Sequence, residues 1–233
     1  MRVILAFILV WASSGLAKHH EMVACIDDHP PYQILGDTPT GTHIEALRVL
    51  AEILDKQITF IESPNFARCL VMLERGTIDV VAGLNPTEER NQFAFYAPFK
   101  QADKLRVVSK SGIVIKTYDD FDEWVIGVPR GTSYFARFDN DNSLRKIPIL
   151  NNRTGFTMLA KGRIDLMMTS PEMISLFAKE IKEANLKVSP IALEELRSKV
   201  TNFGFSKKHR LKLKDEEIIK QVVSAFYQGR FEN

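Results

Sequence analysis

The sequence has almost no net charge. It contains 31 Lys and Arg residues against 29 Asp and Glu residues, which gives a formal net charge of +2 at neutral pH. Nucleic acids and anionic membrane surfaces attract proteins largely through an excess of positive charge. The near balance therefore argues against either of them as the main partner.

Motifs of common catalytic and metal sites are also missing. The chain has no Gly-x-Ser-x-Gly nucleophile elbow, no zinc-type His and Glu motif, and no catalytic Cys–His arrangement. We therefore expect no catalytic residue, no metal and no cofactor. The only two cysteines, Cys25 and Cys69, form either a disulfide or two buried thiols. The sequence leaves both open, because bridging depends on the distance between their Cα atoms.

Long apolar runs are confined to the N-terminus. Arg2 is the one charge before Lys18, residues 3–12 are apolar, and small residues follow up to Ala17. This order is typical of a secretory signal peptide. The run is much shorter than the ~20 residues of a membrane-spanning helix. We expect a signal peptide at 1–17, cleavage after Ala17, and export to the periplasm.

Beyond the signal peptide, apolar strands alternate with amphipathic helices. Segments 22–26, 58–61 and 78–82 favour strands, and segments 42–54 and 65–75 favour helices. This alternation predicts a parallel sheet covered by helices, and so an α/β protein.

An internal repeat indicates two such units. Leu73–Ala82 reappears as Leu159–Met168: in each copy a helix ends at a glycine, and a buried strand begins with Ile-Asp. The second half has its own expected strand at 124–128 and its own expected helices, at 133–138, 154–161 and 171–183. We therefore predict two α/β lobes.

The last predicted helix, 215–227, carries an apolar side that needs a partner surface, which we assign to the first lobe. The chain must then cross between the lobes twice, and the candidate crossings are 104–109 and 200–206. The expected division places residues 18–106 and 204–233 in lobe 1, and residues 107–203 in lobe 2.

Several motifs occur in a characteristic order. They are Asp28–Tyr32, Gly41–Leu47, Leu73–Ala82, Thr87–Arg90 followed by Phe95–Pro98, Val125–Thr132, and Gly162–Asp165. In this order the chain resembles the polar amino-acid type of bacterial extracytoplasmic solute-binding proteins, family 3, the binding components of ABC importers. The resemblance implies a type II, Venus-flytrap fold with two α/β lobes, two hinge crossings and a ligand in the interlobe cleft.

The resemblance also implies a carboxylate site at the motif Thr87–Arg90. In that site Arg90 binds the ligand's carboxylate, which suits a guanidinium because it donates two parallel charge-assisted hydrogen bonds. Thr87 caps the following turn, and Gly83 and Asn85 lie just before the motif. The alternative is a surface arginine paired with a neighbouring glutamate.

The second lobe is expected to add Thr132 and Ser133, as hydroxyls and backbone N–H groups at a helix N-terminus. The alternative role for these two residues is plain helix capping. His29, Tyr32 and Phe66 are candidates for the cleft walls, although Phe66 fits core packing at least as well.

Two departures from the family pattern concern the ligand. Ser170 stands where amino-acid binders of the family usually place the aspartate that pairs with the ligand's ammonium, and Glu172 is the nearest acid. Gly83-Leu84-Asn85 replaces a serine-rich stretch. A carboxylate without an α-amino group therefore remains an option beside an amino acid.

These observations favour a monomeric periplasmic protein that captures a small carboxylate-bearing solute for import by a membrane permease. One alternative is a binding protein that presents its ligand to a membrane receptor. Another is a dehydratase-like enzyme on the same fold, for which Glu172, His29 and Asp28 are the candidate acids and bases.

Overall fold

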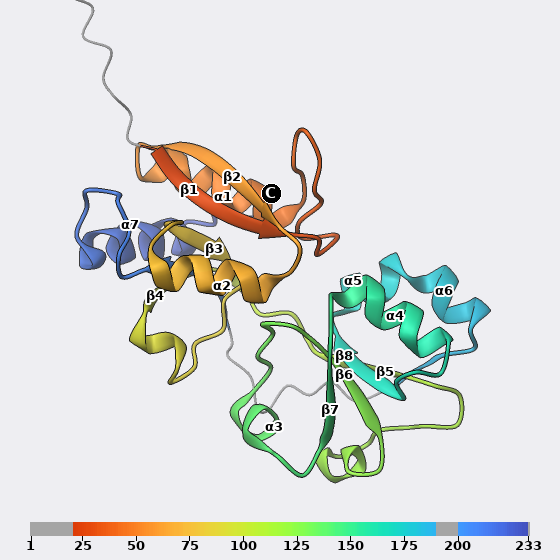
Figure 1. The fold of residues 1–233 in the computed structure, drawn as a ribbon. Helices are drawn as coiled ribbons and strands as arrows, with labels where there is room; N and C mark the ends of the chain where they lie inside the picture. The colour runs from red at the N-terminus through yellow and green to blue at the C-terminus, as the bar shows by residue number, and fades with distance from the viewer. Residues whose placement is uncertain (1–20, 190–199, 233) are drawn as a thin grey trace, which may run out of the picture.

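The computed structural model describes residues 21–189 and 200–232. They form two α/β lobes, each built on a five-stranded sheet (Figure 1). The expected signal peptide and its cleavage site lie outside the described residues. Among the helices that are described, none combines the length and hydropathy needed to cross a membrane.

The first lobe has the strand order β2-β1-β3-β10-β4. Strand β1 pairs in parallel with β2 and β3, and β10 runs antiparallel to β3 and β4. The strands are β1 Glu21–Asp27, β2 Gln57–Ser63, β3 Val80–Ala82, β4 Ala94–Gln101 and β10 Val200–Ser206; the helices are α1 Thr42–Ile53, α2 Phe66–Arg75, α7 Asp215–Tyr227 and the 3-10 turn η1 Arg90–Gln92.

The second lobe repeats this plan with the order β7-β6-β8-β5-β9. Strand β6 is parallel to β7 and β8, and β5 is antiparallel to β8 and β9. Its elements are β5 Arg106–Ser109, η2 Tyr118–Phe121, β6 Val125–Pro129, α3 Ala136–Asn140, β7 Arg145–Ile149, α4 Asn152–Ala160, β8 Leu166–Thr169, α5 Pro171–Leu176, α6 Ala178–Glu183 and β9 Lys187–Val188.

Both sheets are mixed rather than purely parallel. The sequence predicted the parallel strands, and the structure adds antiparallel strands that come from the segments between the lobes. Strand β10 lies in the first sheet over its whole length, so residues 200–206 are not a crossing, and the expected boundary between residues 203 and 204 falls inside this strand. The first passage between sheets lies between Gln101 and Arg106. The second lies between Ser189 and Val200 and falls outside the described residues.

The C-terminal helix packs on the first lobe, as predicted. Its buried residues Ile218 and Val222 join Leu47 and Leu50 of α1 and Phe99 of β4 in one apolar cluster. Figure 1 shows α7 beside the first sheet, so the two ends of the described chain lie in the same lobe. Burial of this helix face stabilises the lobe by removing apolar surface from water.

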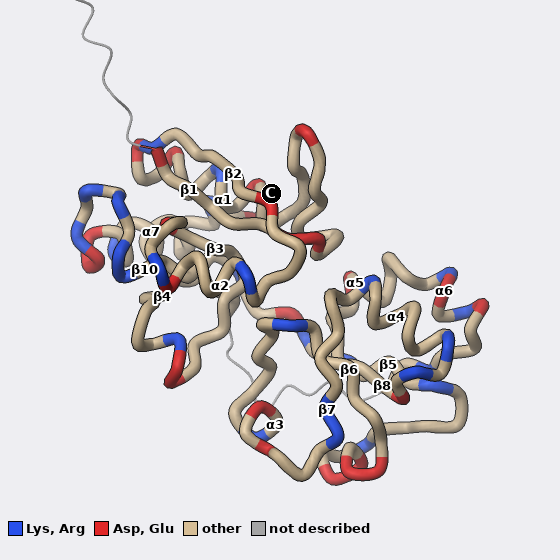
Figure 2. The backbone as a smooth tube through the Cα atoms, in the orientation of Figure 1, with Lys and Arg blue, Asp and Glu red and all other residues tan. Residues whose placement is uncertain are grey.

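Cys25 of β1 and Cys69 of α2 form a disulfide, with their Cα atoms 5.6 Å apart. The bridge joins an inner strand of the first sheet to helix α2. This geometry decides between the two alternatives that the sequence left open. Along the backbone of both lobes, acidic and basic residues are interspersed (Figure 2).

The Ile-Asp repeat plays the same role in both lobes. Asp79 is fully buried, and its Oδ2 accepts the Val23 N–H at 2.8 Å while its own N–H donates to the Val23 carbonyl at 2.8 Å. Asp165 makes the same pair of contacts with Val125, each at 2.8 Å. Each aspartate therefore anchors the start of the first parallel strand of its lobe, β1 or β6.

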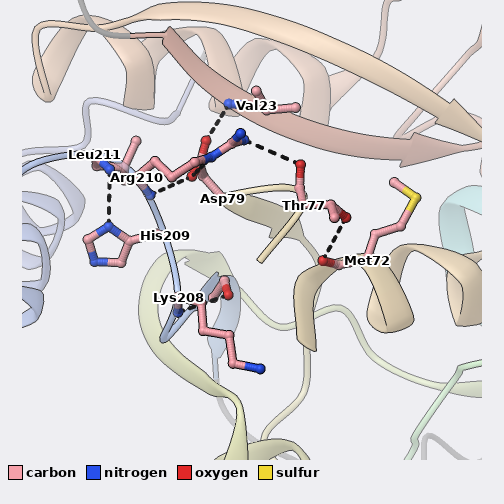
Figure 3. A network of polar contacts seen from close by, with 9 residues as sticks. Val23, Met72, Thr77, Asp79, Lys208, His209, Arg210 and Leu211 are labelled. Carbon is pink, nitrogen blue, oxygen red and sulfur yellow. Dashed lines mark hydrogen bonds and ion pairs between the residues drawn. The ribbon is translucent and has the colours of Figure 1, made fainter. Parts of the chain in front are cut away.

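In the first lobe Asp79 also holds the segment that follows β10 (Figure 3). Its Oδ1 accepts the Arg210 N–H at 2.8 Å, and its carbonyl accepts the Ser206 N–H at 2.9 Å. The Arg210 Nε lies 3.6 Å from Oδ1. One buried carboxylate thus connects three distant parts of the chain.

We expect Asp79→Ala to destabilise the protein by about 2–4 kcal/mol, because it leaves the buried Val23 N–H and the partly buried Arg210 N–H without acceptors. Urea unfolding followed by circular dichroism would measure this change. The control is Glu74→Ala at an exposed position of α2, where we expect a change within about 0.5 kcal/mol. Equal stability of the two variants would contradict the assigned role.

Candidate functional site

A cavity of about 120 Å³ lies between the two lobes. Its walls come from the carboxyl ends of β1 and β3 in the first lobe and of β6 and β8 in the second, where ligands of open α/β sheets bind. This volume is well below the ~300–1,000 Å³ of pockets for drug-sized ligands and suits a small solute.

The cavity brings together nine of the eleven predicted ligand-binding residues. They are His29, Tyr32, Phe66, Gly83, Asn85 and Arg90 from the first lobe, and Thr132, Ser133 and Ser170 from the second. Thr87 does not line it: its hydroxyl accepts the Arg90 N–H at 3.2 Å and so caps the turn. Glu172 is also outside the lining, with Oε2 lying 2.9 Å from the Tyr32 hydroxyl.

Arg90 reaches the cavity from η1 and is 7 % exposed. Its Nη1 donates to the Asn85 carbonyl at 2.8 Å, and its Nη2 donates to the Gly131 carbonyl of the other lobe at 2.6 Å. Burial lowers the pKa of Arg90 from its ordinary value. No carboxylate within the described ranges forms an ion pair with Arg90, so the alternative of pairing with a neighbouring glutamate is not seen. Three of the five guanidinium N–H groups remain for another partner.

The lobes are in close contact at Gly131. Its φ is +83°, and a Cβ at this position would lie 2.5 Å from the Ala67 backbone N. Such a contact is far closer than atoms allow, and the obstructing atom belongs to backbone. Gly131 therefore permits both the turn after β6 and the contact between lobes.

The predicted helix N-terminus at Thr132 and Ser133 is wrong. Helix α3 begins only at Ala136, because Asp139 accepts the Ser133 hydroxyl at 2.6 Å and the Tyr134 N–H at 3.1 Å. The intervening residue Phe135 is extended. Ser133 instead meets the first lobe through its carbonyl, which accepts from Asn85 Nδ2 at 2.6 Å.

The predicted helix at 171–183 is divided at Phe177 into α5 and α6. At its start Ser170 acts as the N-cap, with Oγ accepting the Met173 N–H at 3.3 Å. Pro171 occupies the first turn, where its missing N–H costs no hydrogen bond.

Tyr32 forms a polar connection between the lobes. Its hydroxyl lies 2.7 Å from Ser170 Oγ, 2.9 Å from Glu172 Oε2 and 2.8 Å from Asp103 Oδ2. Asp103 follows β4 in the passage between the sheets and pairs with Lys100 at 2.7 Å. Burial raises the pKa of the Tyr32 hydroxyl above its ordinary value, so it stays protonated and can donate.

The ring of Tyr32 belongs to an aromatic cluster at the cavity wall. It stacks on His43 with ring centroids 4.8 Å apart, and it meets His29 at 5.1 Å. Burial lowers the pKa of His29 to about 4 and that of His43 well below its ordinary value. Both imidazoles are therefore neutral near pH 7, so His29 does not titrate in the physiological range.

Sequence reasoning singled out neither Asp27 nor His43 as a ligand-binding residue, although both line the cavity. Asp27 ends β1, is 6 % exposed, and its Oδ1 has no hydrogen-bond partner in the described structure. Burial, with a smaller contribution from Asp28, raises the pKa of Asp27 to about 7. The sequence analysis named the neighbouring Asp28 and His29 instead, because no pattern in the sequence tells which of two adjacent carboxylates turns inward.

No group of three or more His, Cys, Asp or Glu side chains in the described residues is arranged to hold a metal ion. The cavity offers hydrogen-bond donors, aromatic faces and charges of both signs. Such a lining is suited to holding a small polar molecule in one orientation.

Comparison with known protein families gives one match. The profile of the bacterial extracellular solute-binding proteins, family 3, matches residues 22–225. Among curated proteins, none matches the sequence.

Solved structures share the fold at low sequence identity. An ancestral arginine-binding protein bound to arginine has a TM-score of 0.72 and 21% identity, with 92% of this chain and 94% of that chain covered. The substrate-binding protein of an amino acid ABC transporter has a TM-score of 0.71 and 18% identity, with 90% and 93% covered. Holo ArgBP from T. maritima has a TM-score of 0.71 and 20% identity, with 90% of each chain covered.

We expect Tyr32→Phe to favour separation of the lobes. A hydrogen bond of this hydroxyl contributes about 0.5–1.5 kcal/mol to the closed form. Its loss should therefore raise the ratio of open to closed molecules roughly 2- to 10-fold. Small-angle X-ray scattering of the ligand-free protein should show a larger radius of gyration. Tyr118→Phe is the matched control, since its hydroxyl bonds among the described residues are to Arg137 and Asp141, both in lobe 2. An unchanged radius in both variants would contradict this role of Tyr32.

We expect Asp27→Asn to stabilise the ligand-free protein at pH 8. The unfolded carboxyl titrates near pH 3.9 and the folded one at about 7, so between these values only the folded state holds the proton. Stability contributed by Asp27 is therefore present below pH 4 and is lost as the pH rises through 7. The variant should have the higher Tm at pH 8 and an equal Tm at pH 4, and parallel Tm–pH curves would exclude the raised pKa.

Proposed function

This chain belongs to the bacterial extracellular solute-binding proteins, family 3, and from that premise we propose that it captures a small carboxylate-bearing solute, such as an amino acid, in the interlobe cavity. The observation that carries this proposal is Arg90. A buried guanidinium with no acidic partner in the described structure is costly unless a ligand supplies the negative charge. The spare N–H groups of Arg90 fit a carboxylate.

The amino-acid class is supported by the printed descriptions of structural neighbours. Proteins with this fold include one bound to arginine and one that serves an amino acid ABC transporter. Delivery to a membrane permease for ABC-type import is the role that we propose for this chain. The buried disulfide supports a working compartment outside the cytoplasm, where such bonds persist.

Binding without turnover is the proposed mode of action. The acids considered for catalysis already have partners: Asp28 Oδ2 lies 3.4 Å from Arg153 Nε, and Glu172 contacts Tyr32. Desolvation lowers the pKa of the half-buried His29 to about 4, which is far from the working pH that favours a general base. The solute docks on Arg90, and closure of the lobes then removes it from water.

We expect Arg90→Gln to weaken solute binding by about 2–4 kcal/mol, because the ligand's desolvated carboxylate loses its charge partner. A thermal-shift screen with amino acids, dicarboxylates, amines, sugars and short peptides identifies the solute, since ligand at a hundred times its Kd adds about 2.7 kcal/mol of stability. Calorimetric titration then compares the variants. Arg163→Gln, beyond the cavity lining, is the control. Equal affinity in both variants would refute the carboxylate site.

A further inference from the structure

The outer strands of the two sheets differ in how they are protected from pairing with another chain. These strands are β2 and β4 in the first sheet, and β7 and β9 in the second. An outer strand has a row of backbone N–H and C=O groups without a strand partner, and a strand of another chain can bind to that row. Proline, lysine, irregular pairing or a very short strand usually prevents such binding.

Three of these outer strands carry such protection. Strand β4 contains Pro98, and its pairing with β10 is irregular. Strand β7 contains both Lys146 and Pro148. Strand β9 has only two residues, and one of them is Lys187. Each of these three edges is therefore a poor template for a strand of another molecule.

Strand β2 lacks every one of these features. Its seven residues contain no proline, lysine or arginine, and all seven pair regularly with β1. Within the described part of the chain β2 pairs with β1 alone, so its other edge is open (Figure 1). Ile61 is 39 % exposed. The one charged residue, Glu62, accepts the Gly36 N–H at 3.1 Å, which leaves residues 57–61 as an uncharged open edge.

Residues 57–61 are complementary to a second copy of themselves. In an antiparallel pair centred on Thr59, the two Thr59 residues face each other. Ile58 then faces Phe60 of the second copy, and Gln57 faces Ile61, so no two charges meet. Pairs of threonines and pairs of an aromatic with a β-branched residue each contribute about 0.2–1 kcal/mol across strands.

The same pairing suits the interior of the lobe. Ile58 and Phe60 are half-buried and pack against the apolar cluster between the first sheet and its helices. Their cross-strand contacts with a second copy would therefore join the apolar clusters of two molecules. A twofold arrangement also closes both open edges at once, whereas an unlike strand would cover only one.

We infer that residues 57–61 of β2 form the interface of a weak homodimer, in which two copies pair antiparallel about a twofold axis at Thr59. The first sheets of the two copies then form one continuous sheet. This dimer replaces the monomer that we expected from the sequence. None of residues 57–61 lines the cavity between the lobes, so each copy keeps its own solute site and the inference does not rest on the proposed function.

Sedimentation velocity of the wild type at about 5–500 μM covers the affinities expected of a small interface. We expect the mass to approach that of two chains at the upper end. Thr59→Lys places two ammonium groups opposite each other at the axis and should abolish the dimer. Thr157→Lys, at an exposed position of α4, is the matched control and should leave it intact. Tm and solute binding should stay unchanged in both variants.

Cysteine cross-linking tests the register. Thr59→Cys should form a covalent dimer on mild oxidation, because directly opposed Cα atoms lie about 4.5–5.5 Å apart. Gln57→Cys alone should not, since the two Gln57 positions lie about 14 Å apart at ~3.4 Å per residue. A mixture of Gln57→Cys and Ile61→Cys should cross-link again. The native cysteines are bridged and buried, so they do not interfere.

Three results would overturn the inference. A single-chain mass at every concentration would leave the β2 edge to a strand of a different protein. A dimer that persists in Thr59→Lys would mean that another surface holds the copies together. Cross-linking of Gln57→Cys with itself would contradict the antiparallel register.

Discussion

The two lobes depend on one recurring contact, in which an aspartate forms hydrogen bonds with the backbone at the start of an inner strand of the sheet. Asp79 and Asp165 each exchange two backbone-directed hydrogen bonds with the first residues of β1 and β6. Each carbonyl also accepts an N–H from the segment after the antiparallel strand, from Ser206 and from Lys110. Because a carboxylate accepts several N–H bonds at once, it sets the register where helix, turn and strand meet. The opposite ends of the same strands then meet at the cavity.

Much of this framework was readable in the sequence because it is periodic. The Gly-then-Ile-Asp repeat predicted two equivalent lobes, and apolar spacing predicted α1, α2 and α7 close to their observed bounds. The prediction failed where a single side chain overrides local preference. Asp139 keeps Ser133 and Tyr134 out of α3, and Phe177 interrupts the helix after Ser170.

The candidate site, like the fold, could be predicted only in part. Arg90, Asn85 and Ser170 follow strands in a recognisable order, so their loops could be placed at the cavity in advance. The burial of individual side chains in these loops could not be predicted, because it depends on contacts between segments far apart in the chain. Asp27 and Asp28 are adjacent acids in the sequence, yet one pairs with Arg153 and the other faces the cavity unpaired. The disulfide likewise required the Cα–Cα distance between β1 and α2.

Gly131 shows how an absent side chain can determine a movement. The atoms that a Cβ would strike are the backbone N and Cα of Ala67, which no rotamer change can move aside. Even one methyl group would hold the lobes apart, and it would also strain the turn after β6, where the φ of Gly131 is +83°. The absence of a side chain at Gly131 therefore determines how closely the two lobes can approach. Selection for a tightly enclosing cleft would then act on this residue, although it contributes no chemical group to the ligand.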